Sequence, residues 1–236
     1  RRGVALVMAE VFAFGRHTVT QLLLTLGMVE GDWSAWYRLF SRQRVREEAL
    51  ARQLVSETLQ EMKADDVYVV GTDGTQIVRS SLRMPGTSWL KAVGTAVFKP
   101  GIHRAQRFVH GCWFTPLAGG FSRAIPLRLL PAFPDKAQPA EGAKPCKEWE
   151  AGVYFVRWVR ERLDQGGCQA RQILYLADGG FENAGLWTQL PPRVIGALRT
   201  AKNRALYAYL PPSERHRGRL YGAKQAAPAE LWRQSK

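Results

Sequence analysis

The sequence predicts an α/β fold in which helices cover a mixed β-sheet, with a small all-helical domain in front of it. Two short apolar segments, residues 67–70 and 173–177, have the β-branched and aromatic composition of buried strands. A hairpin and a crossover helix between them predict a sheet with both antiparallel and parallel neighbours. Helical periodicity dominates residues 1–62, so the chain is expected to have two parts.

Residues 1–62 form the predicted accessory helical domain, and residues 63–236 form the sheet domain. The first part contains an apolar helix at residues 4–14 and a second helix that Gly27 ends in the usual position just past a helix. Asp32 is expected to cap a third helix, and a long amphipathic helix follows. Helix, glycine turn, helix is also the outline of a DNA-reading helix-turn-helix, so DNA contact stays open beside a purely structural bundle.

The sheet domain begins with the first apolar strand and continues, after an irregular segment with several glycines and prolines, into a hairpin. The hairpin turns at Gly119 and Gly120. A proline-rich surface loop leads to a helix with arginines on its outer face, and strand, helix and strand follow. The expected bounds are 104–117 and 124–130 for the hairpin strands, 149–163 and 183–190 for the helices, and 173–177 and 194–198 for the last strands.

Both apolar strands lead into an Asp-Gly pair, at Asp73 and at Asp178. The first carboxylate is expected at or just past the carboxyl end of its strand, on the rim of an open α/β sheet where ligands and metals collect. Two matched patterns favour a shared metal site. Because the two carboxylates lie far apart in the sequence, only the fold can bring them together. The structural alternative is a simple turn in which each Asp bonds its own backbone.

The first Asp-Gly pair is also similar to the nucleophile motif of haloacid-dehalogenase-type phosphatases, an apolar strand followed by Asp-X-Asp-Gly-Thr. The nucleophile position of that motif is occupied by Gly71 in this sequence. Because glycine cannot form an aspartyl-phosphate, the residues exclude that chemistry.

The chain is strongly basic, with a formal net charge of +14 over 236 residues. Half of the excess falls in residues 199–236, where nine Lys and Arg residues stand against two acidic residues. Clustered positive charge predicts a polyanionic partner, most commonly nucleic acid, and a solvated tail is the alternative. The residues expected to follow a DNA backbone are Arg199, Lys202, Arg204, Arg215, Arg217 and Arg219.

Three cysteines without C-x-x-C spacing predict reduced thiols in a reducing compartment and no zinc site. None of the four histidines has the spacing of a metal-binding motif. No apolar run approaches the length of a membrane span, and Glu10 interrupts the one N-terminal segment that mimics a signal peptide. A cytoplasmic, nucleoid-associated protein without membrane contact is therefore expected.

The order of elements and the placement of the two acids resemble the DDE transposases of bacterial insertion sequences, whose catalytic domain has the RNase H-like fold. The resemblance runs along nearly the whole chain, and it implies an RNase H-like mixed sheet for residues 63–236. It also implies that Asp73 and Asp178 are the first two catalytic acids. The matching segments are residues 16–20, 73–75, 77–81, 177–181 and 199–207.

The third acid of that family is usually a Glu on a later helix. Glu230 is the one late candidate in this sequence, and the resemblance implies that the third acid follows Lys236. Mg²⁺ is the expected cofactor, with Mn²⁺ as a substitute, because hard divalent ions prefer a few carboxylate ligands. The expected partners are double-stranded DNA at the element ends and at the target, with a homodimer on DNA as an option.

In the expected reaction, water or a 3′-hydroxyl attacks a phosphodiester in line, while Asp73 bridges two metal ions and Asp178 holds one of them. No covalent intermediate with the protein is implied. Three functions stay open. The first is a transposase that cleaves and joins DNA, the second is an RNase H-fold nuclease that does not join strands, and the third is a non-catalytic DNA-binding remnant.

Overall fold

The computed structural model divides the chain into two compact units, Arg1–Leu50 and Ala51–Lys236. The sequence places this boundary near residue 62. It lies earlier in the structure because α4 (Glu47–Gln60) contributes Ala51 and Val55 to the core of the second unit. The structure describes residues 1–236 except 16, 42–45, 64, 97, 135–136, 138–143, 209, 217–220 and 235–236.

The described part of the first unit consists of α1 (Arg2–Phe12), α2 (Val19–Thr25) and α3 (Ser34–Tyr37). The Thr18 hydroxyl caps α2 by accepting a hydrogen bond from the Gln21 amide at 3.2 Å. Side chains from all three helices share one apolar core, as in a packed bundle, and DNA contact by this unit stays a prediction. The buried core residues are Leu6, Ala9, Leu22, Leu23 and Trp36.

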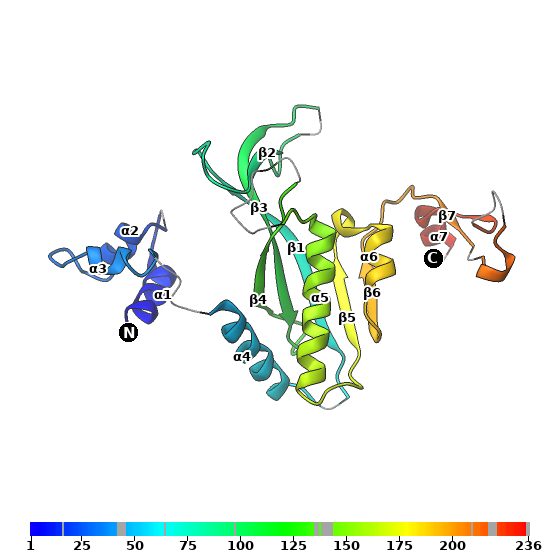
Figure 1. Ribbon diagram of the computed structural model, residues 1–236, viewed down its shortest axis with the longest axis horizontal. Helices are drawn as coiled ribbons and strands as arrows, with labels where there is room; N and C mark the ends of the chain where they lie inside the picture. Colours follow the sequence, from blue (N-terminus) through cyan, green and yellow to red (C-terminus); the bar gives the residue numbers. More distant parts are fainter. Residues whose placement is uncertain are drawn as a thin grey trace. The chain divides into compact units, whose positions relative to one another are not determined.

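The second unit is built on a six-stranded mixed sheet, drawn in Figure 1. Its strands are β1 (Tyr68–Val78), β2 (Thr87–Lys91), β3 (Ile102–Phe114), β4 (Ala124–Pro131), β5 (Ile173–Ala177) and β6 (Val194–Leu198). The central strand β1 runs antiparallel to β3 and parallel to β5, and β6 continues the sheet parallel to β5. On its other side β3 pairs antiparallel with β2 and β4. An antiparallel hairpin followed by parallel strands, each reached through a helix, is the RNase H-like arrangement expected from the sequence.

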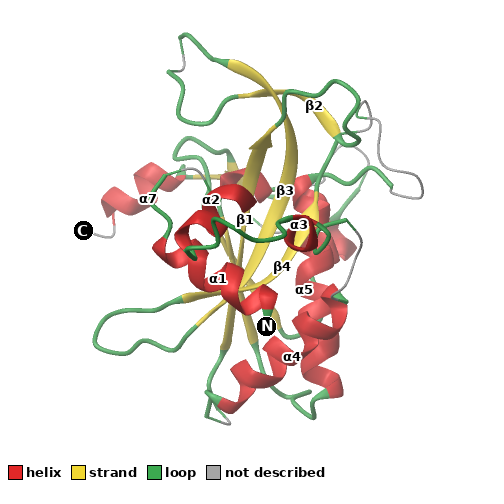
Figure 2. Ribbon diagram, turned by 90° about the vertical axis from the view of Figure 1, so that its left-hand side faces the viewer, coloured by secondary structure: helices red, strands yellow, loops and turns green. Residues whose placement is uncertain are grey.

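Three helices of this unit, α4, α5 (Glu148–Gln165) and α6 (Ala184–Gln189), pack on the sheet (Figures 1 and 2). The close fit of α5 depends on Gly111 of β3, where a Cβ would lie 2.5 Å from the Phe155 ring. Because that ring is rigid and buried, a larger residue at this position would push the helix away from the sheet. The buried side chains of α5 that fill the core are Val153, Phe155, Val156, Trp158, Val159 and Leu163.

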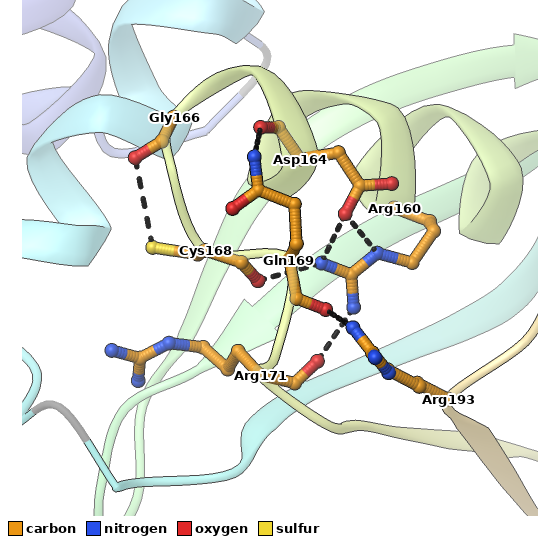
Figure 3. A network of polar contacts seen from close by, with 7 residues as sticks. All are labelled: Arg160, Asp164, Gly166, Cys168, Gln169, Arg171 and Arg193. Atoms are coloured by element: carbon orange, nitrogen blue, oxygen red, sulfur yellow. Dashed lines mark hydrogen bonds and ion pairs between the residues drawn. The ribbon is translucent and has the colours of Figure 1, made fainter.

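A buried arginine fixes the end of α5 against the loop that leads into β5 (Figure 3). Arg160 is only 6% exposed. Its guanidinium donates hydrogen bonds to the Asp164 carboxylate and to the backbone carbonyls of Cys168 and Arg171. A buried charge is tolerated when it is paired and hydrogen-bonded in this way, so the network anchors the position at which β5 begins.

Short elements make up the rest of the described chain. They are η1 (Gly179–Phe181) after β5, and β7 (Leu206–Tyr207), η2 (Pro212–Glu214), β8 (Lys224–Gln225) and α7 (Pro228–Gln234) after β6. β7 and β8 form a separate antiparallel pair, and α7 has no buried residue. Within the described residues, no helix has both the length and the apolar character needed to cross a membrane.

The central strand is longer than the sequence indicates. The apolar run predicts that Asp73 stands at or just past the end of the strand, whereas β1 continues to Val78 because residues 73–78 keep pairing with β3. Its polar residues are stabilised by this ladder rather than by burial. β2 lies inside the segment expected to be irregular, and it too is held by pairing with β3.

Candidate active site

Asp73 lies on β1, and Asp178 directly follows the neighbouring strand β5. The parallel pairing of β1 with β5 runs in register up to Thr72 and Ala177, so the next residue along each chain is one of the two acids. Asp178 keeps extended backbone angles. Adjacent strands lie about 4.8 Å apart, and residues in register point to the same face of a sheet. The fold therefore brings together the two carboxylates that lie far apart in the sequence.

Each of these carboxylates uses one oxygen for a local hydrogen bond. Asp73 Oδ1 accepts a bond from the Gly74 amide at 2.9 Å, and Asp178 Oδ1 accepts one from the Gly180 amide at 2.8 Å. Neither Oδ2 atom is hydrogen-bonded to a residue that the structure describes. The self-bonding expected of a simple turn is thus present, but each exposed carboxylate retains a free oxygen.

β3 adds a histidine and a thiol beside Asp73. His110 lies directly opposite Asp73 in the β1–β3 ladder, and Cys112 lies opposite Gly71. Burial raises the pKa of the Cys112 thiol, and the charge of Asp73 raises it further. This thiol therefore stays protonated at neutral pH and is a poor nucleophile and metal ligand. His110 is isolated in the sequence, and only the strand register reveals it as a neighbour of Asp73.

A third carboxylate, which the sequence reasoning missed, approaches from α5. Glu148 is the first residue of that helix, and its Oε2 accepts a hydrogen bond from Arg107 Nη1 at 3.0 Å. Its Oε1 lies 2.5 Å from the position that a Cβ on Gly74 would occupy. Burial raises the pKa of the Glu148 carboxyl, the Arg107 guanidinium opposes the rise, and the charges of Asp178 and Asp73 add to it. Glu148 thus lies within electrostatic range of both acids.

The loop after β6 lines a polar pocket of about 780 Å³ beside Asp178. Glu182, whose side chain is 12% exposed, organises this loop. Its carboxylate accepts hydrogen bonds from the Thr200 hydroxyl at 2.9 and 3.0 Å and pairs with Arg204 at 2.8 Å. Two further predicted DNA-binding residues, Arg199 and Lys202, line the same pocket. The remaining lining residues are Gly179, Gly180, Ala201 and Asn203.

The other predicted residues lie apart from this pocket or outside the described chain. Arg215 Nε donates a hydrogen bond to the Leu210 carbonyl at 2.9 Å. Arg217 and Arg219 belong to the residues that the structure does not describe. Glu230, the late acid singled out in the sequence, is the third residue of α7. Its carboxylate accepts a bond from the Ala227 amide at 2.9 Å, as in a capping box at the start of the helix.

The donor set at the two aspartates suits a hard divalent cation. Mg²⁺ prefers carboxylate oxygens and needs few of them, because it keeps several waters as its other ligands. The free Oδ2 atoms of Asp73 and Asp178 are donors of this kind. Among the described residues, no three His, Cys, Asp or Glu side chains converge closely enough to hold a metal ion together. Asp73 and Asp178 are therefore the candidate metal ligands among the described residues.

Known proteins provide one family match. A family model described as DDE superfamily endonuclease matches residues 1–236, whereas no curated protein matches the chain. Among solved structures, the Mos1 transposase paired-end complex with left transposon end matches with a TM-score of 0.23 and 12% sequence identity. The match covers 80% of this chain and 55% of that chain, so the present chain spans little more than half the length of that protein chain.

Proposed function

The chain belongs to the DDE superfamily endonucleases, and on that premise we propose that it is a metal-dependent DNA transposase. The reaction proposed is cleavage and joining of DNA strands at the ends of a bacterial insertion sequence. One observation carries the proposal. The parallel register of β1 and β5 makes Asp73 and Asp178 neighbours at the end of β5, which is what a shared ion at this edge needs.

Asp73 and Asp178 would hold the ion through their free Oδ2 atoms. Mg²⁺ is the proposed ion, with Mn²⁺ as a substitute. When bound, it makes the attacking water or hydroxyl more nucleophilic and stabilises the charge that develops on the phosphate and the leaving oxygen. The local bonds to the Gly74 and Gly180 amides orient the two carboxylates, so that Oδ2 of each is aimed before substrate arrives.

The loop after β6 is proposed as the binding site for the DNA backbone. It carries Arg199, Lys202 and Arg204 beside Asp178, and the Glu182 bonds hold it in one conformation. Arg199 and Lys202 form no ion pair with any described residue, so their charges remain available to phosphates. Such contacts favour DNA without reading its sequence, and they weaken steeply as salt rises. Arg215, Arg217 and Arg219 extend the proposed basic surface.

A non-catalytic, DNA-binding remnant of a transposase is the second candidate. It is favoured by the observation that no three metal-ligating side chains converge among the described residues. A nuclease that cuts without joining strands would share the site proposed above, and it differs only in the fate of the 3′-hydroxyl. A strand-transfer assay with a labelled duplex separates that nuclease from a transposase.

The proposal is tested by nicking of supercoiled plasmid DNA in Mg²⁺ and in Mn²⁺. Asp73→Asn and Asp178→Asn should each reduce nicking to background while duplex binding persists, because Asn keeps the local hydrogen bond and removes the charge that attracts the ion. The double variant should be no worse than either single variant, since the two groups act as one unit. A single variant that nicks at the wild-type rate would remove that residue from the site. Wild-type protein that binds DNA and never nicks it would favour the remnant.

A further inference from the structure

Residues 74–134 contain eight Lys and Arg residues and no Asp or Glu. The whole chain has 20 acidic residues, so a stretch of this length without any of them is a distinct feature of the sequence. It includes the end of β1 and all of β2, β3 and β4, and it is separate from the basic segment 199–236. A surface with positive charge and no negative charge favours a polyanionic partner.

The strand register places Trp89 and Arg104 on the same face of the sheet as Asp73. Asp73 lies opposite His110 of β3, and Trp89 of β2 lies opposite Arg104. Positions 110 and 104 are separated by an even number of residues, so their side chains point to one face. α5 packs on the other face, where Gly111 lies against it. From position 110 to position 104 the strand spans about 20 Å, and β2 lies beyond the part of the sheet that α5 covers (Figure 1).

Trp89 is an exposed aromatic side chain at the rim of a pocket. It is 66% exposed, although tryptophan is highly buried on average. The pocket has a volume of about 580 Å³, within the range of small-ligand sites, and its polar lining includes Thr87, Ser88 and Arg104. Because β2 is an edge strand of the described sheet, the backbone groups on its outer side are open to a ligand. An aromatic ring, an open strand edge and a hollow of this size fit a nucleobase.

Three basic side chains lie on the same face as the indole. Arg104 donates a hydrogen bond from Nη2 to the Leu82 carbonyl at 2.8 Å, and its Nε has no hydrogen-bond partner among the described residues. Arg79 donates from Nε to Gln106 Oε1 at 3.0 Å. Lys91 is exposed and follows the indole by two positions in β2. Within the described chain none of the three cations pairs with a carboxylate, so their charges remain available to phosphates.

The alternative is that these residues only hold the loop in front of β2. Arg104 and Gln106 do so, through their bonds to the Leu82 and Pro85 carbonyls. Those bonds explain the two β3 residues, but they explain neither the exposed indole nor the exposed ammonium of β2. A protein partner would also cover an indole. Unpaired cations around it, in a segment without any acid, favour a phosphate-bearing ligand instead.

We propose that a surface formed by Arg79, Trp89, Lys91 and Arg104, the β2 surface, binds an unpaired strand of DNA. The indole stacks on a base, and the three cations contact the neighbouring phosphates. An unpaired strand fits better than a duplex, because the bases of a duplex stack on one another and offer no free face to the indole. The inference rests on the proposed function for its choice of DNA, but it needs neither the ion nor the two aspartates.

The test is fluorescence anisotropy of a labelled oligothymidylate of about 15 nucleotides, titrated with the full chain in EDTA. Trp89→Leu keeps an apolar side chain and removes the aromatic face, so single-strand affinity should fall about tenfold. Trp89→Phe keeps a ring and should bind within about threefold of the wild type. Equal affinities in all three proteins, or equal losses in both variants, would overturn the stacking role. Wild-type protein that does not bind the oligonucleotide would overturn the inference as a whole.

Phe121→Leu is the matched control. It makes the same exchange of an aromatic for an aliphatic side chain in the turn between β3 and β4, where Phe121 is 80% exposed, and affinity should not change. A loss as large as that of Trp89→Leu would contradict a specific role for the indole. A blunt duplex of the same length provides the second comparison, and its affinity should depend little on Trp89. An equal loss for the duplex would show that the β2 surface does not select unpaired bases.

Lys91→Gln tests the phosphate contacts. It removes one charge from the surface, so the slope of log affinity against log salt concentration for the single strand should become shallower by about 0.7. An unchanged slope would remove Lys91 from the β2 surface.

The inference and the proposed function can fail separately. If Trp89→Leu binds the single strand as tightly as the wild type while Asp73→Asn abolishes nicking, the β2 surface is wrong and the proposed function stands. If Trp89→Leu weakens single-strand binding while Asp73→Asn nicks at the wild-type rate, the β2 surface stands and the proposed metal site is wrong.

Discussion

The two ends of β5 carry charged clusters of opposite character. At its start, Arg160 is buried, and its guanidinium meets one carboxylate and two backbone carbonyls (Figure 3). At its end, Asp178 follows β5 next to the strand that carries Asp73. Burial raises the pKa of Glu148, the Arg107 guanidinium opposes the rise, and the charges of both aspartates add to it. The first cluster pairs a positive charge with acceptors, whereas the second gathers negative charges and leaves an oxygen free on each of them.

The Arg160 cluster therefore stabilises the fold, whereas the carboxylates at the other end of β5 repel one another. Hydrogen bonds to a buried guanidinium matter for stability because a buried charge or acceptor that loses its partner pays the cost of desolvation. Carboxylates held close together disfavour each other's ionised form. A fold tolerates such repulsion where a cation binds and neutralises it. Acids with shifted pKa values are therefore found at functional sites. Neutralising a charge should therefore have opposite effects on stability at the two ends of β5.

The largest effect is expected at the paired end. Arg160→Met removes the bonds of the buried guanidinium to Asp164 and to the Arg171 carbonyl, and one of the two bonds that the Cys168 carbonyl accepts, so the free energy of unfolding should fall by about 2–4 kcal/mol. Urea unfolding followed by circular dichroism measures the loss. The control is Arg157→Met on the same helix. Arg157 is exposed, and it donates bonds to the Gln189 carbonyl at 3.1 Å and to Gln189 Oε1 at 3.5 Å, so its loss should cost less than about 1 kcal/mol. Equal losses in the two variants would contradict the role assigned to the buried network.

A smaller effect of opposite sign is expected for Glu148→Gln without metal. Because burial and the two aspartates raise its pKa above the ordinary 4.5, the folded chain holds this proton more tightly than the unfolded chain does. Stability is therefore lost as the pH rises through the raised value. The glutamine variant should match the wild type below pH 4.5 and exceed it at pH 7, measured by urea unfolding in EDTA. A variant less stable than the wild type at pH 7 would show that pairing with Arg107 outweighs the repulsion.

The smallest effect is expected for Asp73→Asn in the absence of metal. Asp73 is exposed, and Asn can accept the same bond from the Gly74 amide, so the free energy of unfolding should change by less than about 0.5 kcal/mol. Thermal unfolding in EDTA provides the measurement. The same scans with millimolar Mn²⁺ sharpen the comparison, because the ion should stabilise the wild type and not the variant. Loss of folding in this variant would assign Asp73 a structural role.

Much of the fold could be predicted from local patterns. The apolar composition of residues 173–177 and the spacing along α5 gave strands and helices close to those observed, because burial on a covered face leaves a periodic signal. β1 beyond Asp73 and the whole of β2 could not be predicted in this way. Their polar residues are held in extended form by pairing with β3, and a partner strand leaves no trace in the sequence of the strand that it holds.

The residues of the candidate site also differ in whether the sequence could predict them. Asp73 and Asp178 could be singled out because each follows an apolar strand and precedes a glycine. Glu148 begins an ordinary helix and His110 lies within a strand, so neither carries a local pattern of its own. Strand register places His110 opposite Asp73, and the missing side chain of Gly74 admits Glu148. Both are properties of the assembled sheet, and the roles of Asp73 and Asp178 as metal ligands are proposals.

The most direct measurement is backbone cleavage by Fe²⁺ bound in place of Mg²⁺. Ascorbate and peroxide generate radicals at the bound ion, and these cut the chain close to its ligands. If Asp73 and Asp178 share one ion, cuts should appear near both residues, excess Mg²⁺ should suppress both, and Asp73→Asn should abolish the cut at 178 as well as the cut at 73. Cuts elsewhere in the chain, or an Asp73→Asn protein that still breaks at 178, would contradict the shared site.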